Sequence, residues 1–68
     1  MVNYFIRIEH KYVDMFYDFC ERHSIQQSYK FEGIAGRSSE LYQATMTNKD
    51  ATALKLTIPI NLMEAKNE

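Results

Sequence analysis

The chain has 68 residues, of which 46% are hydrophobic and 25% are charged, and its formal net charge is −1. This composition is too apolar for a disordered protein, the chain is too short for two domains, and no apolar run approaches the roughly 18–20 residues that cross a bilayer. A single cysteine cannot form an intramolecular disulfide, and the first residues lack a signal-peptide pattern. We therefore expect one small, soluble domain in the reducing cytoplasm.

The first predicted element is a strand over residues 2–9, where apolar and polar side chains alternate. Period-two alternation with β-branched and aromatic residues is typical of a strand with one buried face. The predicted core face carries Val2, Tyr4, Ile6 and Ile8, and the opposite face carries Asn3, Phe5, Arg7 and Glu9. Phe5 is therefore an aromatic side chain on the face predicted to point away from the core.

From Lys11 to His23 the apolar residues follow a helical period instead. Five of them cover one arc of the helix: Tyr12, Val13, Phe16, Phe19 and Cys20. This pattern predicts an amphipathic helix that packs its aromatic face on a sheet. The opposite arc holds an acidic ridge of Asp14, Asp18 and Glu21, which we expect to be solvated.

A hairpin is predicted in the middle of the chain. Tyr29–Glu32 and Glu40–Thr47 both alternate, and the segment between them, Gly33–Ser39, contains both glycines. Two alternating runs on either side of a glycine-containing turn favour two antiparallel strands.

The last third of the chain allows two interpretations. Thr47 and Asp50 have the spacing of a capping box, which favours a helix over residues 48–57 followed by an extended segment with a short strand near Ile60. However, the alternate positions 54–62 are all occupied by Leu or Ile, which is a strand pattern. The capping signal favours the helix. Residues 64–68 are polar, and we expect them to fray.

The predicted order is strand, helix, strand, strand, helix and a possible final strand. This order is typical of a small α+β, ferredoxin-like domain, in which both helices cover one face of an antiparallel sheet and the other face is open. We expect a single domain over residues 1–63, followed by a tail over residues 64–68.

The residue types needed for metal binding or catalysis are sparse. Cys20 and His23 share a helix side, but a zinc site needs about four ligands and the sequence offers no second close pair. Ser38 and Ser39 have no histidine near them in the sequence that could act as a base. We therefore expect no metal site, no cofactor and no catalytic residues, and a protein that is not an enzyme.

The open sheet face is the predicted site of interaction. A chain this small builds a core of only about 3–5 kcal/mol, so oligomerisation or partner binding is expected. Aromatic and neutral side chains favour the core of a protein interface, and unpaired strand edges favour self-association. The candidate partner-binding residues are Phe5, Arg7, Leu41, Gln43 and Thr45.

RNA or single-stranded nucleic acid is the alternative partner for this face. Phe5 with Tyr29 or Phe31 could stack bases, and Arg7 and Lys30 could neutralise phosphates. Gly33–Gly36 forms a nominal G-x-x-G, but it is predicted to join strands rather than helices. The slightly acidic net charge argues against a nucleic-acid partner, because cationic charge dominates backbone binding. A small ligand bound at a dimer interface is neither supported nor excluded.

The segment Tyr42–Leu56 resembles a pattern found in short accessory proteins of tailed bacteriophages, especially those that infect cyanobacteria. There, a strand runs into an Asp-Ala helix that ends in a Lys-Leu pair. The resemblance covers about a quarter of the chain and implies a small protein of the host cytoplasm that binds and redirects a host enzyme or regulator. It carries over no functional residues.

Overall fold

The computed structural model of the chain describes residues 1–30 and 38–65. It contains four strands, β1 (Val2–Glu9), β2 (Gln27–Lys30), β3 (Ser39–Met46) and β4 (Asn61–Glu64), and two α-helices, α1 (Val13–Arg22) and α2 (Asn48–Thr57). The strands form one antiparallel sheet in the order β2-β3-β1-β4. The α+β class predicted from the sequence is confirmed.

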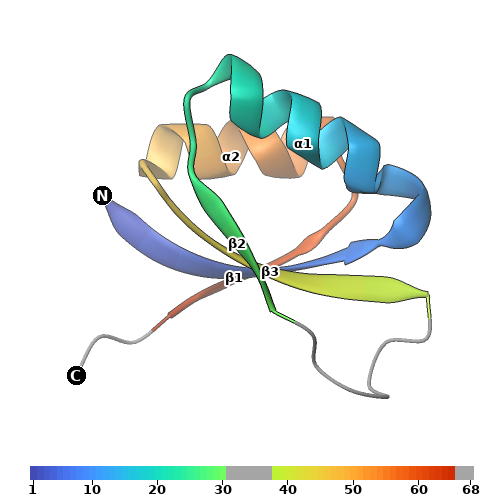
Figure 1. Cartoon of the computed structure of the whole chain (residues 1–68). Helices are drawn as coiled ribbons and strands as arrows, with labels where there is room; N and C mark the ends of the chain where they lie inside the picture. The colour runs from blue at the N-terminus through green and yellow to red at the C-terminus, as the bar shows by residue number, and fades with distance from the viewer. Residues whose placement is uncertain (31–37, 66–68) are drawn as a thin grey trace.

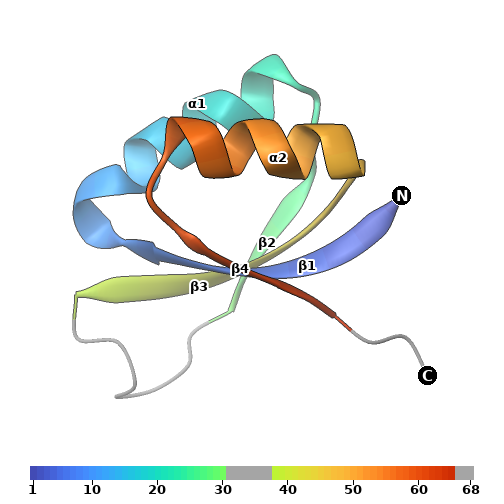
Figure 2. The same ribbon diagram turned by 180° about the vertical axis from the view of Figure 1, so that it is seen from behind.

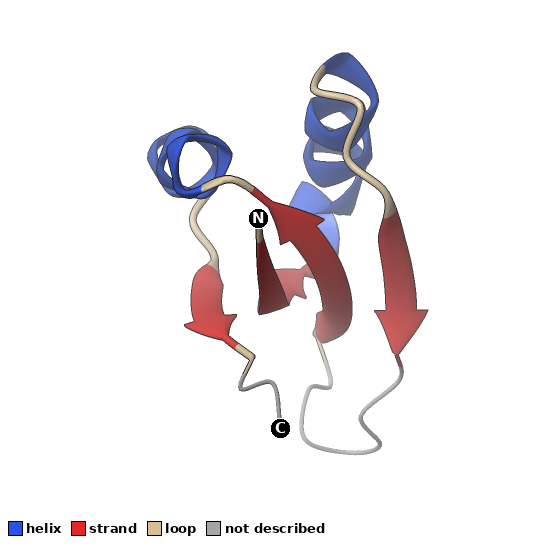
Figure 3. Ribbon diagram, turned by 90° about the vertical axis from the view of Figure 1, so that its left-hand side faces the viewer, coloured by secondary structure: helices blue, strands red, loops and turns tan. Residues whose placement is uncertain are grey.

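The molecule has two layers (Figures 1 and 3). Both helices lie on the same side of the sheet, α1 over the half with β2 and β3, and α2 over the half with β1 and β4 (Figure 3). Tyr17 on α1 contacts Tyr42 on β3, and Asn48 on α2 accepts a hydrogen bond from Tyr4 on β1. Within the described residues, no helix covers the other face of the sheet.

The core lies between these layers, and β1 supplies its centre. Tyr4, Ile6 and Ile8 are buried, as the alternation of this strand predicts. Phe16, Phe19 and Cys20 pack against them from α1, so the predicted aromatic arc of this helix is also confirmed. The flanking Met15 and Tyr17 of α1 remain about half exposed.

A 3₁₀ turn, η1 (His10–Tyr12), precedes α1, so the predicted helix begins with a tighter first turn.

At the C-terminal end of α1, Ser24 has a φ of 55°, in the left-handed region that favours glycine. Its N–H donates to Glu21 O, and the N–H of Ile25 donates to Cys20 O. These two bonds form a Schellman motif, which ends the helix and directs Ile25 into the core.

The second strand begins earlier than predicted. β2 starts at Gln27 rather than Tyr29, because Gln27 lies opposite Ala44 on β3 and is already paired there. The predicted turn over Gly33–Ser39 lies largely outside the described residues, as do residues 31 and 32 of the predicted strand. β3 begins at Ser39, one residue before its predicted start.

The ambiguous last third is a helix followed by a strand (Figure 2). α2 has the predicted bounds, and the hydroxyl of Thr47 accepts a hydrogen bond from the N–H of Asp50. β4 then pairs with β1 and continues through Glu64, and the N–H of Ala65 donates to Asn3 O. The strand therefore includes Glu64, which the sequence assigned to the tail, and Ala65 is also held in place. Residues 66–68 are outside the described part of the chain.

Candidate functional site

The helix-free face of the sheet brings all five predicted partner-binding residues together. Two cross-strand rows lie at its centre. In the first, Phe5 on β1 lies between Gln43 on β3 and Met63 on β4. In the second, Arg7 lies between Leu41 and Asn61. A third row, on the other side of the first, pairs Thr45 with Asn3. Opposite residues of paired strands point to the same face, so these side chains form one continuous surface, here called the open face.

Phe5 is the central apolar side chain of the open face. It lies on an inner strand, it is half-buried, and its neighbour Met63 is 69% exposed. Leu41 is also half-buried and is diagonal to Phe5 across the β1–β3 pair. The sequence suggests Met63 as an apolar contact if it is exposed, but it does not place Met63 on this face, because its strand could be assigned only once its pairing with β1 was known.

Neutral polar groups surround this centre at one end. The hydroxyl of Thr45 donates to Oδ1 of Asn3 at 3.5 Å, and the hydroxyl of Ser28 donates to the carbonyl of Gln43 at 3.5 Å. A shallow hollow of about 570 Å³ lies at this end, and most of its lining is amides and hydroxyls, including Asn3, Gln26, Ser28, Gln43 and Thr45. This end can exchange hydrogen bonds with a partner without introducing charge.

The charged groups of the open face lie toward the opposite end. Arg7 and Glu9 border a second hollow of about 480 Å³, together with Ser39, Pro59 and Asn61. The charges of Arg7 and Glu9 are opposite in sign. The registers also place Lys30 of β2 in the same cross-strand row as Arg7, on the other side of Leu41. The described strands therefore bring two basic positions and one acidic position, Glu9, to the open face.

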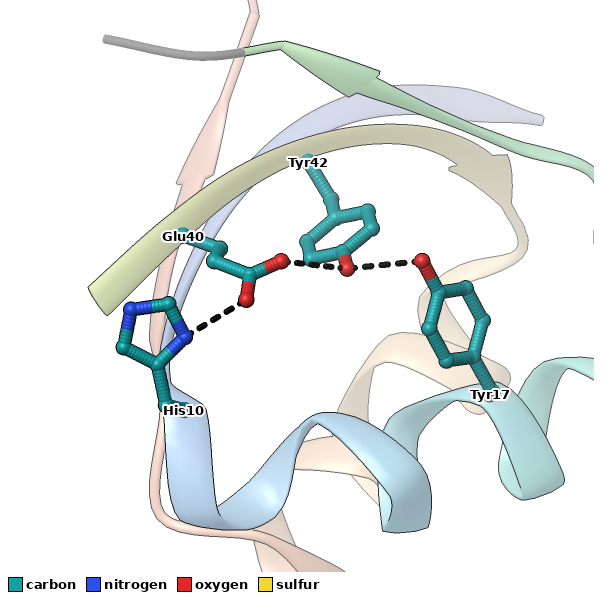
Figure 4. A network of polar contacts seen from close by, with 4 residues as sticks. All are labelled: His10, Tyr17, Glu40 and Tyr42. Atoms are coloured by element: carbon teal, nitrogen blue, oxygen red, sulfur yellow. Dashed lines mark hydrogen bonds and ion pairs between the residues drawn. The ribbon is translucent and has the colours of Figure 1, made fainter. Parts of the chain in front are cut away.

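A second candidate site is a chain of polar contacts on the helix side of the sheet (Figure 4). Nδ1 of His10 lies 2.6 Å from Oε2 of Glu40, and the hydroxyl of Tyr42 donates to Oε1 of the same carboxylate at 2.8 Å. The hydroxyl of Tyr17 lies 2.8 Å from that of Tyr42. The network therefore runs from the exposed His10, through the buried Tyr42, to the half-exposed Tyr17.

The donors in this network follow from its chemistry. An ionised Glu40 carboxylate can only accept hydrogen bonds, so Nδ1 of His10 carries the hydrogen of that bond. Tyr42 gives its single hydrogen to Glu40, so the hydroxyl of Tyr17 donates to the oxygen of Tyr42. Burial raises the pKa of Tyr42 above its usual range, and its hydrogen bonds to Tyr17 and Glu40 raise it further. Tyr42 is therefore a structural phenol rather than an acid at neutral pH.

The His10–Glu40 pair resembles the base and orienting carboxylate of a catalytic triad, but a triad also needs a nucleophile. Ser38 lies beside His10, which the sequence could not show, and the contact is between backbones: His10 N–H donates to Ser38 O at 2.8 Å. Within the described residues, no hydroxyl or thiol is hydrogen-bonded to the imidazole. The geometry thus provides no nucleophile–base pair there.

The candidate metal ligands are engaged elsewhere. Cys20 is 2% exposed, and burial raises the pKa of its thiol to about 11, so it is not the accessible thiolate that binds metal. The ring of His23 stacks on Phe19 at 4.1 Å, and its Nδ1 lies 3.3 Å from Oδ1 of Asp50. Across residues 1–30 and 38–65, no group of three His, Cys, Asp or Glu side chains is placed to hold a metal ion.

In comparisons with protein-family models, curated proteins and solved structures, the chain has no match. None of the helices in the described part of the chain is long and apolar enough to cross a membrane.

Proposed function

We propose that the protein is a non-catalytic, ferredoxin-like binding module that contacts a protein partner through its open face. The observation that carries this proposal is the placement of Phe5 beside Met63 and Gln43 at the centre of a sheet face that no described helix covers. The strand order β2-β3-β1-β4, with antiparallel neighbours and both helices on one side, supports the ferredoxin-like assignment.

The chemistry of the open face suits a protein partner. Interface centres are rich in aromatic residues, Met and Arg and poor in other charged residues, while their rims are polar. The open face follows this arrangement, with Phe5 and Met63 at its centre, Arg7 beside them, and the hydroxyl and amide groups of Thr45 and Asn3 toward one end.

The open face is also large enough. The molecule measures 30 × 30 × 17 Å, so the sheet forms one of its two broad sides. A standard interface buries about 800 Å² on each partner. This is about one-sixth of the 4898 Å² of surface that the chain exposes. A partner of ordinary size can therefore be held by this side alone.

The nature of the partner follows from the resemblance of Tyr42–Leu56 to short bacteriophage proteins. On this proposal the partner is a host enzyme or regulator in the host cytoplasm, whose activity changes when the module binds. Because the described strands bring only three charged positions to the open face, Arg7, Glu9 and Lys30, we expect binding to depend mainly on apolar contact and hydrogen bonds and to change little with salt.

Nucleic acid is the second candidate, and one observation favours it. Phe5 and Arg7 lie two residues apart on an inner strand of a four-stranded sheet, where a base could stack and a phosphate could be neutralised. The net charge of −1 weakens this candidate. Measurable affinity for a random single-stranded oligonucleotide at low salt, lost at high salt, would favour it over a protein partner.

The proposal is tested with an affinity pull-down from the cell in which the protein acts, using immobilised wild-type chain and two open-face variants, Phe5→Ala and Leu41→Ala. Leu56→Ala is the matched control, because Leu56 is an 84% exposed leucine on α2, on the other side of the molecule. We expect one or more proteins to be retained by the wild type and by the control and lost from both open-face variants.

Circular dichroism and thermal melting of each variant show whether it is folded before it is compared. Equal retention by the wild type and by folded Phe5→Ala and Leu41→Ala proteins would rule out the open face as the binding site. Retention that is lost in the Leu56→Ala variant and kept by both open-face variants would mean that the helix side, and not the open face, binds the partner.

A further inference from the structure

β4 is an edge strand of the sheet, and its outer side has no strand beside it in the described structure. It lies at the far end of the order from β2 and pairs only with β1. An edge strand presents backbone N–H and C=O groups that can pair with another strand. Which residues present these groups depends on the hydrogen-bond phase between β1 and β4.

One backbone hydrogen bond fixes which β4 residues direct their N–H and C=O groups toward β1. The N–H of Ala65 donates to the carbonyl of Asn3, and these two residues lie opposite each other when the β1–β4 register is continued by one residue beyond Tyr4 and Glu64. Hydrogen-bonded and non-hydrogen-bonded pairs alternate along an antiparallel ladder, so residues 63 and 61 also direct their backbone groups toward β1. Leu62 and Glu64 lie between them and direct their N–H and C=O groups outward, away from the sheet.

These outward groups are complementary to those of a second copy. If two β4 strands run antiparallel about a two-fold axis at Met63, Leu62 of each copy lies opposite Glu64 of the other. Each of these pairs can exchange two backbone hydrogen bonds. Met63, 69% exposed, then lies opposite its own counterpart, and the two side chains cover each other on the open face.

The side chains beside this edge are also complementary in charge. Glu64 lies opposite the buried Tyr4 in the β1–β4 register, so its side chain is on the helix side of the sheet. On α2, Asp50 faces α1, where it contacts His23. Lys55 is about 140° further round the same helix, on the side that faces the β4 edge.

The position of Lys55 along α2 matches that of Glu64 in the second copy. Asn48, the first residue of α2, accepts a hydrogen bond from Tyr4, and Tyr4 lies opposite Glu64. The helix therefore begins near the Glu64 end of β4, and its other end lies toward Asn61 and Leu62. Lys55 is near that end, and Glu64 of the second copy lies opposite Leu62. In the described part of the chain, neither Lys55 nor Glu64 forms an ion pair within its own copy.

We propose that two copies of this chain pair through their β4 strands about a two-fold axis at Met63, with Lys55 of each copy beside Glu64 of the other. The two sheets then form one continuous antiparallel sheet, with all four helices on one side and both open faces on the other. The contact consists of one short strand and one helix side, so the dimer is weak and concentration-dependent rather than obligate.

The register is tested with cysteine cross-linking of the full chain. In an antiparallel non-hydrogen-bonded pair the Cα atoms are about 4.5 Å apart, within the range of a disulfide. Met63→Cys is therefore expected to form a covalent dimer on mild oxidation. Asn61→Cys is the matched control on the same face of β4, where the two sulfurs would be separated by about four residues, or about 14 Å, along the strand.

The wild-type chain, with Cys20 buried, provides the background. A covalent dimer that forms with Met63→Cys and at least about tenfold more slowly with Asn61→Cys would support the register, because only the first pair meets the distance limit. Equal rates for the two variants, or no dimer from a folded Met63→Cys protein at high concentration, would overturn the proposal.

The charge pair is tested by sedimentation equilibrium. Lys55→Glu and Glu64→Lys are each expected to weaken the dimer by about fivefold at low salt, and the double variant is expected to restore it. Lys49→Glu is the control, because it changes the net charge equally on the same helix but lies about 120° from Lys55. Failure of the double variant to restore the dimer, or a wild type that is monomeric at every concentration tested, would overturn the proposal. Phe5→Ala is expected to leave the dimer intact, so this result is independent of the open-face proposal.

Discussion

The hydroxyl of Tyr17 on α1 lies 2.8 Å from the hydroxyl of Tyr42 on β3, which joins the helix layer to the sheet by a polar contact within an aromatic cluster. The two rings meet edge to face, with centroids 5.6 Å apart. Tyr42 is 1% exposed, so its hydroxyl depends on Tyr17 and Glu40 for its partners. The contact therefore stabilises the packing of α1 on the sheet.

Removing these hydroxyls separately and together measures the coupling between them. Tyr42→Phe is expected to lower the free energy of unfolding by about 1–3 kcal/mol, because the bond to the Glu40 carboxylate is lost, and Tyr17→Phe by about 0.5–1.5 kcal/mol. In urea denaturation, the double variant should lose less than the sum of the two, because each single change already breaks the shared bond. Additive losses would show that the two hydroxyls are not coupled.

Ser24 offers a stabilising substitution. It follows α1 with a φ of 55°, a conformation that disfavours a residue with a Cβ and that glycine adopts readily. Ser24→Gly is expected to raise the free energy of unfolding by about 0.5–1 kcal/mol in urea titrations, because the left-handed conformation costs a residue with a Cβ about 1–2 kcal/mol and the greater chain entropy of glycine offsets part of that gain. Ser24→Ala keeps the Cβ and is the control, for which we expect no gain. A loss of stability with glycine would show that the Ser24 side chain contributes more than its backbone conformation costs.

The sequence predicted the elements whose patterns are local. The alternation in residues 2–9 and the aromatic arc of the helix after His10 each depend on neighbours within a few positions, so both could be predicted without tertiary information. The start of β2 could not, because Gln27 joins the strand only through its pairing with Ala44. β4 was ambiguous for the same reason: its strand conformation depends on β1, more than fifty residues earlier in the chain.

The residues of the candidate site also divide into those that a local pattern predicts and those that only the folded chain shows. Phe5 and Leu41 could be placed on the open face because each lies out of phase with the buried residues of its own strand. Met63 could not be placed there before the β1–β4 register was known. The His10–Glu40 contact joins residues 30 positions apart and leaves no periodic signal in the sequence, so only the folded chain shows it.

The capping box before α2 is formed only in part, which leads to a further prediction. The Thr47 hydroxyl accepts the N–H of Asp50, as predicted, but the Asp50 carboxylate contacts His23 on α1. Thr47→Ala is therefore expected to lower the free energy of unfolding by about 0.5–2 kcal/mol, measured in urea. Thr47→Ser keeps the hydroxyl and should lose less than half of that amount. Equal losses would mean that the methyl group, not the hydrogen bond, is responsible.

Cys20 predicts how stability depends on pH in the alkaline range. Burial raises the pKa of its thiol from the usual 9.0 to about 11, so the folded chain keeps a proton that the unfolded chain releases. The contribution of this thiol to stability is fully present below pH 9 and is lost as the pH rises toward 11. We expect the free energy of unfolding to be level from about pH 7 to 8.5 and to fall above about pH 9.

Cys20→Ala separates this effect from the titration of Tyr42, whose pKa is also raised by burial. The alanine variant begins less stable because it loses a buried sulfur, but its free energy of unfolding should fall less steeply between pH 9 and 10. A soluble disulfide reagent gives a second measurement at neutral pH, where Cys20 should react slowly in the folded chain and rapidly in urea. Parallel pH profiles for the wild type and the alanine variant would contradict the prediction, because they would mean that the thiol releases its proton equally in both states.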